Sequence, residues 1–144
     1  MAAAEVSTTE LREHLEAIAT EVFKPRGSVL FSRGDPVSGV FVVRSGRIKL
    51  GLGCNERLYP SRFLGAGALV GLPATMSGEP YSLTAEVLED ARLGLVTRDA
   101  VLGLLRENSL LSFQVMQLLS EEISGMRSAM KEKVVPSSKA GRRS

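Results

Sequence analysis

The chain has 144 residues, of which 44% are hydrophobic and 24% are charged, as in an ordinary globular domain. No apolar run approaches the ~20 residues needed to cross a bilayer, and acidic residues are scattered through residues 1–23, which excludes a signal-peptide pattern and favours a cytoplasmic protein. One cysteine and one histidine exclude a disulfide framework, an iron–sulfur cluster held by this chain alone and a histidine-based metal site.

The formal net charge of +2 is unevenly distributed. Residues 131–144 hold five basic residues and one acidic residue, which leaves 13 of the 18 basic and 15 of the 16 acidic residues in 1–130. The main body is therefore not a nucleic-acid-binding surface as a whole. Residues 134–144 lack periodicity and are predicted to form a disordered basic tail, solvated in preference to bound to an acidic partner.

Apolar residues at helical spacing predict a helix over residues 8–23. Residues 28–97 then change to short strands with frequent turns, typical of an antiparallel sandwich or barrel. Turns are expected at 32–36 and at Ser45–Gly46, and a hairpin tip at 53–56 contains Cys54, taken as an incidental thiol. The predicted strands are 29–31, 40–43, 47–50, 57–63, 68–70, 82–87 and 92–96.

The stretch from Gly65 to Ala85 is dense in glycine, proline, serine and threonine. Such a composition between strands predicts a loop whose backbone closely approaches either a ligand or a neighbouring strand.

Two helices are predicted at the end of the chain. The first covers residues 98–106 with Thr97 as its cap, and the second begins after a cap at Asn108 or Ser109 and reaches Lys131 or Lys133. An apolar stripe follows the long helix, and its first half is expected to cover the strands. The stripe consists of Leu111, Val115, Leu118, Leu119, Ile123, Met126 and Met130.

The order of these elements resembles the cyclic-nucleotide-binding domain of Crp/Fnr-type bacterial regulators, over about residues 10–131. The most specific part is Val29–Leu50, where Gly34-Asp35, Val40–Val43 and Gly46 stand at the family's spacing. The resemblance implies a mainly β fold, an antiparallel jelly-roll-like β-roll at about 28–97 with an N-terminal helix. It also implies a long C-terminal dimerisation helix at about 109–132, within one domain spanning 1–133.

In this family a phosphate cassette binds the nucleotide through a Gly-Glu pair, a short helix and an Arg-Ser or Arg-Thr pair. The resemblance places Leu72 where the carboxylate belongs and Tyr81 where the arginine belongs. Loss of such a charge-assisted pair costs about 3–5 kcal/mol, so no useful binding of cyclic AMP or cyclic GMP is expected. A filled pocket, with Leu72 packed inward and Tyr81 covering it, is favoured over an apolar pocket for another small ligand. The cassette positions are Gly71, Leu72, Pro73, Ala74, Tyr81 and Ser82.

The resemblance also implies a homodimer through the long helix, and a stripe packed only on its own roll is the alternative. A patch of small residues, Gly125, Ser128 and Ala129, fits a close helix crossing. The residues assigned to the dimer helix are Leu111, Val115, Leu119, Ile123, Met126 and Met130.

No residues are arranged for catalysis, and no cofactor is expected; His14 is interpreted as solvated or capping, not as a haem ligand. Related regulators continue into a winged helix-turn-helix, whereas about a dozen residues follow the long helix here, so this chain alone is not expected to bind DNA specifically. Three hypotheses remain: a sensor domain with a changed ligand, an interaction protein that dimerises with itself or with a full regulator, and a truncated transcription factor.

Overall fold

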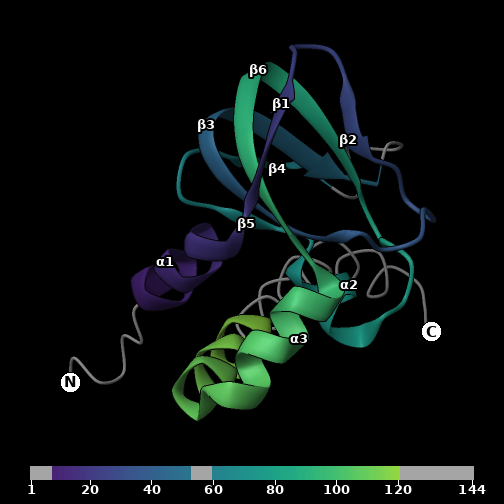
Figure 1. Ribbon diagram of the computed structural model, residues 1–144. Helices are drawn as coiled ribbons and strands as arrows, with labels where there is room; N and C mark the ends of the chain where they lie inside the picture. The colour runs from purple at the N-terminus through teal and green to yellow at the C-terminus, as the bar shows by residue number, and fades with distance from the viewer. Residues whose placement is uncertain (1–7, 53–59, 121–144) are drawn as a thin grey trace, which may run out of the picture.

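The computed structural model describes residues 8–52 and 60–120. The described helices gather at one end of the strands (Figure 1). None of them is long and apolar enough to span a membrane. In chain order the elements are α1 (Thr8–Ile18), β1 (Thr20–Lys24), β2 (Val29–Phe31), β3 (Gly39–Gly51), β4 (Arg62–Leu64), β5 (Leu69–Val70), α2 (Leu72–Ser77), β6 (Thr84–Thr97) and α3 (Arg98–Glu107), followed by helical residues 109–120.

The strands form one antiparallel sheet built around β3 and β6, the two longest strands. β1 and β2 pair with β6, while β4 and β5 pair with β3, giving the order β1-β6-β3-β4. The predicted fold class, mainly antiparallel β with flanking helices, is confirmed.

The predicted first helix is wrong beyond Ile18. Residues 20–24 form β1, which pairs with β6 from Thr20 opposite Leu95 to Lys24 opposite Ala91. This segment contains threonine, valine and phenylalanine, which favour strands, and the ladder of β6 overrides the helical spacing. The first two turns behave as predicted, because Leu11 and Leu15 are fully buried.

The predicted turn at Ser45–Gly46 is also wrong, because β3 continues through it. The pairing with β6 shifts register between Val43 and Ile48, which identifies an irregularity of bulge type. Gly46 lies there with φ +99°, and a Cβ on it would stand 2.6 Å from the backbone oxygen of Asp90. The two strands predicted at 82–87 and 92–96 are likewise one strand, β6, which follows β3 through the same bend.

The core is divided between two clusters that use opposite faces of β3. Side chains such as Phe41 and Val43 pack inside the roll, while Val40 and Val42 face the helices. Leu11, Leu15, Val101, Leu111 and Val115 complete the helix-side cluster. The alternation of a strand therefore supplies both cores at once.

The N-terminal caps of α3 and of the helix that follows it are those predicted from the sequence. The Thr97 hydroxyl accepts a hydrogen bond from the Ala100 N–H at 3.3 Å, and Asn108 Oδ1 accepts one from the Leu111 N–H at 3.2 Å. The predicted helix is helical over the described residues 109–120. Its continuation with Ile123, Met126 and Met130, the basic tail and the hairpin tip with Cys54 all lie outside the described residues.

Candidate functional site

The stretch from Gly65 to Ala85 keeps the strand predicted at 68–70 as β5, but the segment after that strand is not only a loop, as its composition had suggested. It contains β5 and the six-residue helix α2, whose two ends are glycines with left-handed backbone: Gly71 at φ 90° and Gly78 at φ 81°. Inside the helix the Thr75 hydroxyl donates to the Gly71 oxygen at 2.8 Å, and Thr75 is fully buried. The helix at the predicted cassette is thus closed at both ends by glycine.

Tyr81 lies in the interior of the roll and is 3% exposed. Its ring stacks on Phe31, with centroids 3.7 Å apart and planes inclined by 7°. Its hydroxyl donates to the Gly39 oxygen at 2.8 Å and accepts from the Gly39 N–H at 3.2 Å and the Ser38 N–H at 3.1 Å. The phenol therefore satisfies the backbone where β3 begins.

The backbone of Tyr81 is fixed as well. Its N–H donates to the Asp35 oxygen at 3.0 Å, and its own oxygen accepts from the Gly34 N–H at 2.8 Å. A Cβ on Gly71 would stand 3.0 Å from Tyr81 Cε1, so the ring also lies directly against the start of α2. The structure thus brings Tyr81 together with Gly71 and with the turn at residues 32–35.

The other predicted cassette residues do not all gather around Tyr81. Ala74 belongs to the same roll-side cluster as Tyr81, but Leu72 is buried in the helix-side cluster. Pro73 and Ser82 are exposed. The expected packing, with Tyr81 covering an inward-pointing Leu72, is therefore not the observed arrangement, because the helical turn of α2 directs Leu72 toward the helices.

Arg98, the first residue of α3, is the arginine that contacts α2. Its Nε donates to the Thr75 oxygen at 2.8 Å, and a Cβ on Gly78 would stand 2.9 Å from its NH2 group. A cation at a helix C-terminus offsets the partial negative charge of the terminal carbonyls. Arg98 thus stabilises the end of α2 that is opposite to an anion-binding N-terminus.

Replacing Arg98 with glutamine is expected to lower the free energy of unfolding by about 1–2 kcal/mol, because a partly buried charge-assisted hydrogen bond is lost. Arg106→Gln on the same helix is the control, since Arg106 is exposed, and it should change stability by less than ~0.5 kcal/mol. Urea unfolding of both variants measures the difference, and equal midpoints would show that Arg98 does not hold α2.

Of the residues assigned to the dimer helix, Leu111, Val115 and Leu119 lie in the described part of the chain. Leu111 and Val115 are almost fully buried in the protomer's own helix-side cluster, and Leu119 packs against it partly buried. The burial of these three residues agrees with the alternative prediction, in which the apolar stripe packs on its own roll. Three neighbours instead point outward: Leu110 is 50%, Phe113 50% and Met116 65% exposed.

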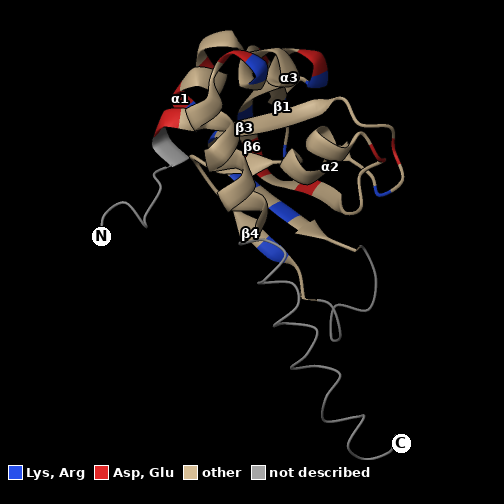
Figure 2. Ribbon diagram, turned by 90° about the horizontal axis from the view of Figure 1, so that it is seen from below, with Lys and Arg blue, Asp and Glu red and all other residues tan. Residues whose placement is uncertain are grey.

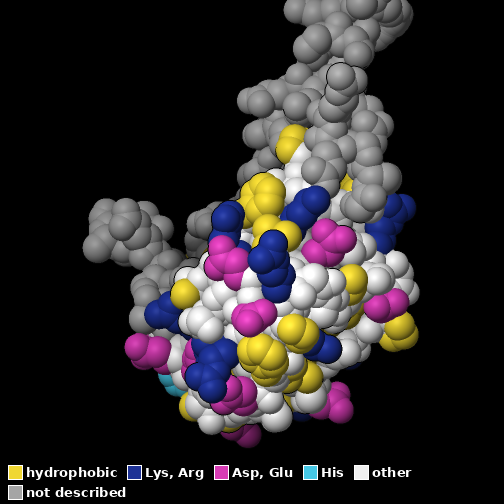
Figure 3. Space-filling view, turned by 90° about the horizontal axis from the view of Figure 1, so that it is seen from above, with side chains coloured by type: hydrophobic (Ala, Val, Ile, Leu, Met, Phe, Trp, Pro, Cys, Tyr) yellow, Lys and Arg dark blue, Asp and Glu magenta, His cyan; other side chains and the backbone are white. Residues whose placement is uncertain are grey.

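Charges of both signs are mixed over the described helices and strands (Figure 2). Seen from the strand end, small groups of hydrophobic side chains are separated by charged ones (Figure 3). The described residues contain no group of three or more histidine, cysteine, aspartate or glutamate side chains placed to hold a metal ion. His14, which was predicted to be solvated or capping, is half-buried, and its Nδ1 lies 2.9 Å from the Glu10 oxygen within α1.

Several partners at this site were missed by sequence reasoning. Phe31 was assigned only to a strand, and nothing in the residues around Ser38 and Gly39 indicated that a tyrosine 42 residues later would bind their backbone. Arg98 follows a recognised cap, yet its contact with Thr75 spans 23 residues. Such contacts are fixed by the topology and have no local pattern.

Comparison with known proteins agrees with the resemblance to the cyclic-nucleotide-binding domain. Residues 21–108 match the family described as the cyclic nucleotide-binding domain, which is more than half of the chain. The "Anaerobic regulatory protein" of Bacillus subtilis (strain 168) is 26% identical over 127 residues, which cover 87% of this chain and 53% of that protein. The chain thus spans about half the length of this curated relative.

Two solved structures illustrate the shared fold. The catabolite activator protein of Thermus thermophilus has a TM-score of 0.72 at 22% identity, covering 87% of this chain and 59% of that one. The sensor domain of the transcriptional regulator DNR from Pseudomonas aeruginosa has a TM-score of 0.67 at 18% identity, covering 89% and 95%. At these identities the likeness establishes the architecture.

Proposed function

The chain belongs to the cyclic nucleotide-binding domain family, and on that premise we propose that it is a non-catalytic sensor or regulatory domain that does not respond to cyclic AMP or cyclic GMP. The observation that carries the proposal is the position of Tyr81. This phenol is buried, stacked on Phe31 and hydrogen-bonded to the backbone of Gly39, at the position where the family resemblance puts the phosphate-binding arginine.

The chemistry of this replacement disfavours a phosphate. An arginine offers a charged fork that pairs with two anionic oxygens, whereas the single Tyr81 O–H already donates to Gly39. Binding a phosphate would require that hydrogen bond to break and would leave buried backbone groups unpaired. Leu72, which the family resemblance places where the ribose-binding carboxylate belongs, packs in the helix-side cluster, and its side chain offers no polar atom.

Arg98 does not replace the missing cation. It is bound to the C-terminal end of α2, at Thr75, whereas the family's anion site uses the N-terminal end of the short helix. The contacts of Arg98 thus support a structural role and leave the cassette without its charge partner.

Thermal unfolding with cyclic nucleotides tests the proposal. At 1 mM cyclic AMP or cyclic GMP, a micromolar site would stabilise the folded protein by about 4 kcal/mol, whereas we expect no shift in Tm beyond that caused by 1 mM 5′-AMP, the matched control. Calorimetric titration measures the same quantity independently. A saturable shift specific to the cyclic nucleotide would overturn the loss of cyclic-nucleotide binding.

A second candidate function is an interaction protein that dimerises with itself or with a Crp/Fnr-type regulator. It is favoured by the exposed side chains of Leu110, Phe113 and Met116, which recur every three residues along helical residues 109–120. Side chains at this spacing lie on one side of a helix and would be covered by a partner helix.

Phe113→Glu is expected to convert a dimer into a monomer, because it places a charge in the centre of this exposed group. Light scattering coupled to size-exclusion chromatography measures the mass, with wild-type protein expected at twice the mass of one chain. Phe63→Glu, an equally exposed phenylalanine on β4, is the control and should leave the mass unchanged. A wild-type monomer at high micromolar concentration would count against homodimerisation.

A further inference from the structure

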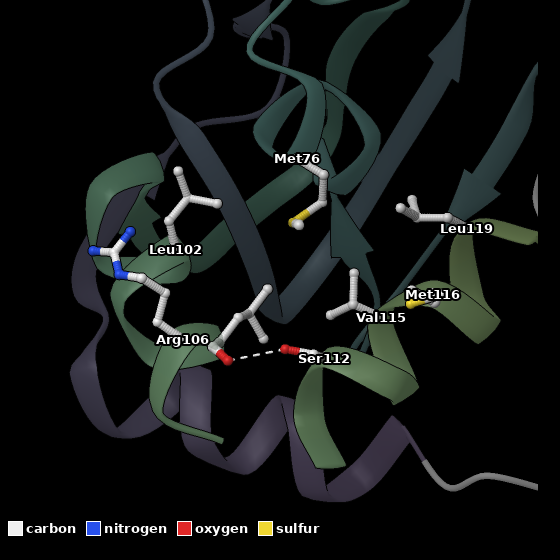
Figure 4. A pocket seen from close by; sticks show the side chains of 8 residues that line it. Met76, Leu102, Arg106, Ser112, Val115, Met116 and Leu119 are labelled. Carbon is white, nitrogen blue, oxygen red and sulfur yellow. Dashed lines mark hydrogen bonds between the residues drawn. The ribbon is translucent and has the colours of Figure 1, made fainter. Parts of the chain in front are cut away.

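An open groove of about 340 Å³, called the cavity below, lies outside the roll, between α2, α3 and helical residues 109–120. Its walls are mostly apolar, and Figure 4 shows Met76, Val115 and Leu119 directed toward its centre. Leu102, Leu105 and Met116 complete the apolar lining. Each of the three helical segments therefore contributes apolar surface to one shared space.

The rim of the cavity carries an uncompensated charge. Arg106 lines the cavity, and among the described residues it has no hydrogen-bond or ion-pair partner. Its guanidinium lies at the edge of the space, on the side of Leu102 (Figure 4). The hydroxyl of Ser112 is already used, because it donates to the Leu105 oxygen at 2.9 Å. The cavity thus combines an apolar interior with one available cationic donor.

We propose that this cavity binds a small amphipathic carboxylate, with an apolar chain of roughly six to ten carbons among the methionines and its carboxylate on Arg106. The volume is roughly twice that of the ~150 Å³ apolar cavity that accommodates benzene, and it falls within the range of small-molecule pockets. Methionine side chains adapt to flexible apolar chains, and a planar guanidinium pairs with a carboxylate through two hydrogen bonds.

Such a ligand would contact α2 and residues 109–120 at the same time. Met76 comes from the helix that begins at Gly71, against the ring of Tyr81, while Met116 belongs to the outward-facing group with Phe113. None of the lining residues is one of the six cassette positions, although Met76 shares α2 with three of them. The proposal therefore does not rest on the proposed loss of cyclic-nucleotide binding.

The test uses the full chain with methyl-labelled methionines and follows the Met76 and Met116 signals by NMR. Three probes are compared: octanoate, 1-octanol with the same chain and no charge, and acetate with the charge and no chain. We expect saturable shifts of both signals with octanoate, about three- to fivefold weaker binding of octanol, and no shift with acetate. Arg106→Gln should reduce octanoate binding to the level of octanol, while Arg33→Gln, an exposed arginine in the turn at 32–35, should change nothing.

Leu102→Trp provides a second test, because an indole at this half-buried position would fill the cavity and abolish the shifts from both octyl probes. The proposal fails if octanoate leaves both signals unmoved up to millimolar concentration, or if Arg106→Gln does not change the ratio of octanoate to octanol binding. It also fails if octanoate moves signals throughout the protein as a detergent would. The proposal also fails if the mass measured by light scattering changes in parallel with the shifts, because the cavity would then be an interface with a second copy of the chain.

Discussion

Replacing Gly46 with alanine is expected to lower the free energy of unfolding by about 2–5 kcal/mol, which corresponds to a fall in Tm of roughly 6–20 °C. Two costs combine at this position. A left-handed backbone costs a residue with a Cβ about 1–2 kcal/mol, and crowding in a packed region adds about 1–3 kcal/mol. The new Cβ would stand 2.6 Å from the Asp90 oxygen and 2.7 Å from the Ala91 Cα, which are backbone atoms that cannot rotate away.

Alanine substitutions at two other glycines distinguish the cost of the left-handed backbone from the cost of crowding. Gly34 also has a positive φ, of +94°, but no atom lies within 4 Å of a Cβ placed there, so Gly34→Ala should cost about 1–2 kcal/mol. Gly65 has open space and no left-handed backbone, so Gly65→Ala should change stability by less than ~0.5 kcal/mol or raise it slightly. Denaturant midpoints rank the three variants. If Gly46→Ala were no worse than Gly34→Ala, β3 and β6 would not approach each other closely at their bend.

Truncation of Tyr81 to alanine should cost about 3–5 kcal/mol, because a large buried ring and its stacking on Phe31 are lost and a cavity remains. Tyr81→Phe isolates the hydroxyl. It keeps the ring but leaves buried backbone groups of Gly39 without their partner, which should cost about 1–3 kcal/mol.

Phe23→Ala is the control for Tyr81, because Phe23 is an aromatic residue of β1 with 58% of its surface exposed; its loss should cost less than ~1 kcal/mol. Urea unfolding of the three variants supplies the comparison. A Tyr81→Phe variant as stable as the wild type would mean that the hydroxyl does not restrain Gly39. The phenol would then be free to move aside, and the argument against a bound phosphate would lose its main support.

Local chemistry was sufficient to predict several elements of the fold. Thr97 and Asn108 were identified as caps because a short polar side chain before an apolar helical pattern satisfies the first free N–H groups. The apolar run Val40–Val43 was recognised as a buried strand, although its two faces serve different clusters. These features depend on neighbours within a few residues.

The predictions of secondary structure were wrong where contacts with residues distant in the sequence determine the local conformation. A glycine in a strand pattern is equally compatible with a turn and with a bulge, and only the partner strand at Ala91 makes Gly46 a bulge. The six residues of α2 are too few to form a stable helix alone, and Arg98 and Gly78 fix its end. The cassette positions came from the family resemblance, whereas the separation of Leu72 from Tyr81 required the three-dimensional arrangement.

The division of the interior into two clusters has a consequence for how such a domain diversifies. Since Val40 and Val42 face one cluster while Phe41 and Val43 face the other, substitutions within the roll leave the seat of the helices largely untouched. The two sets of side chains pack against different neighbours, so the contents of the roll can vary while the packing of the helices on the sheet is kept. A change in what the roll accommodates would thus not require a change in the architecture that surrounds it.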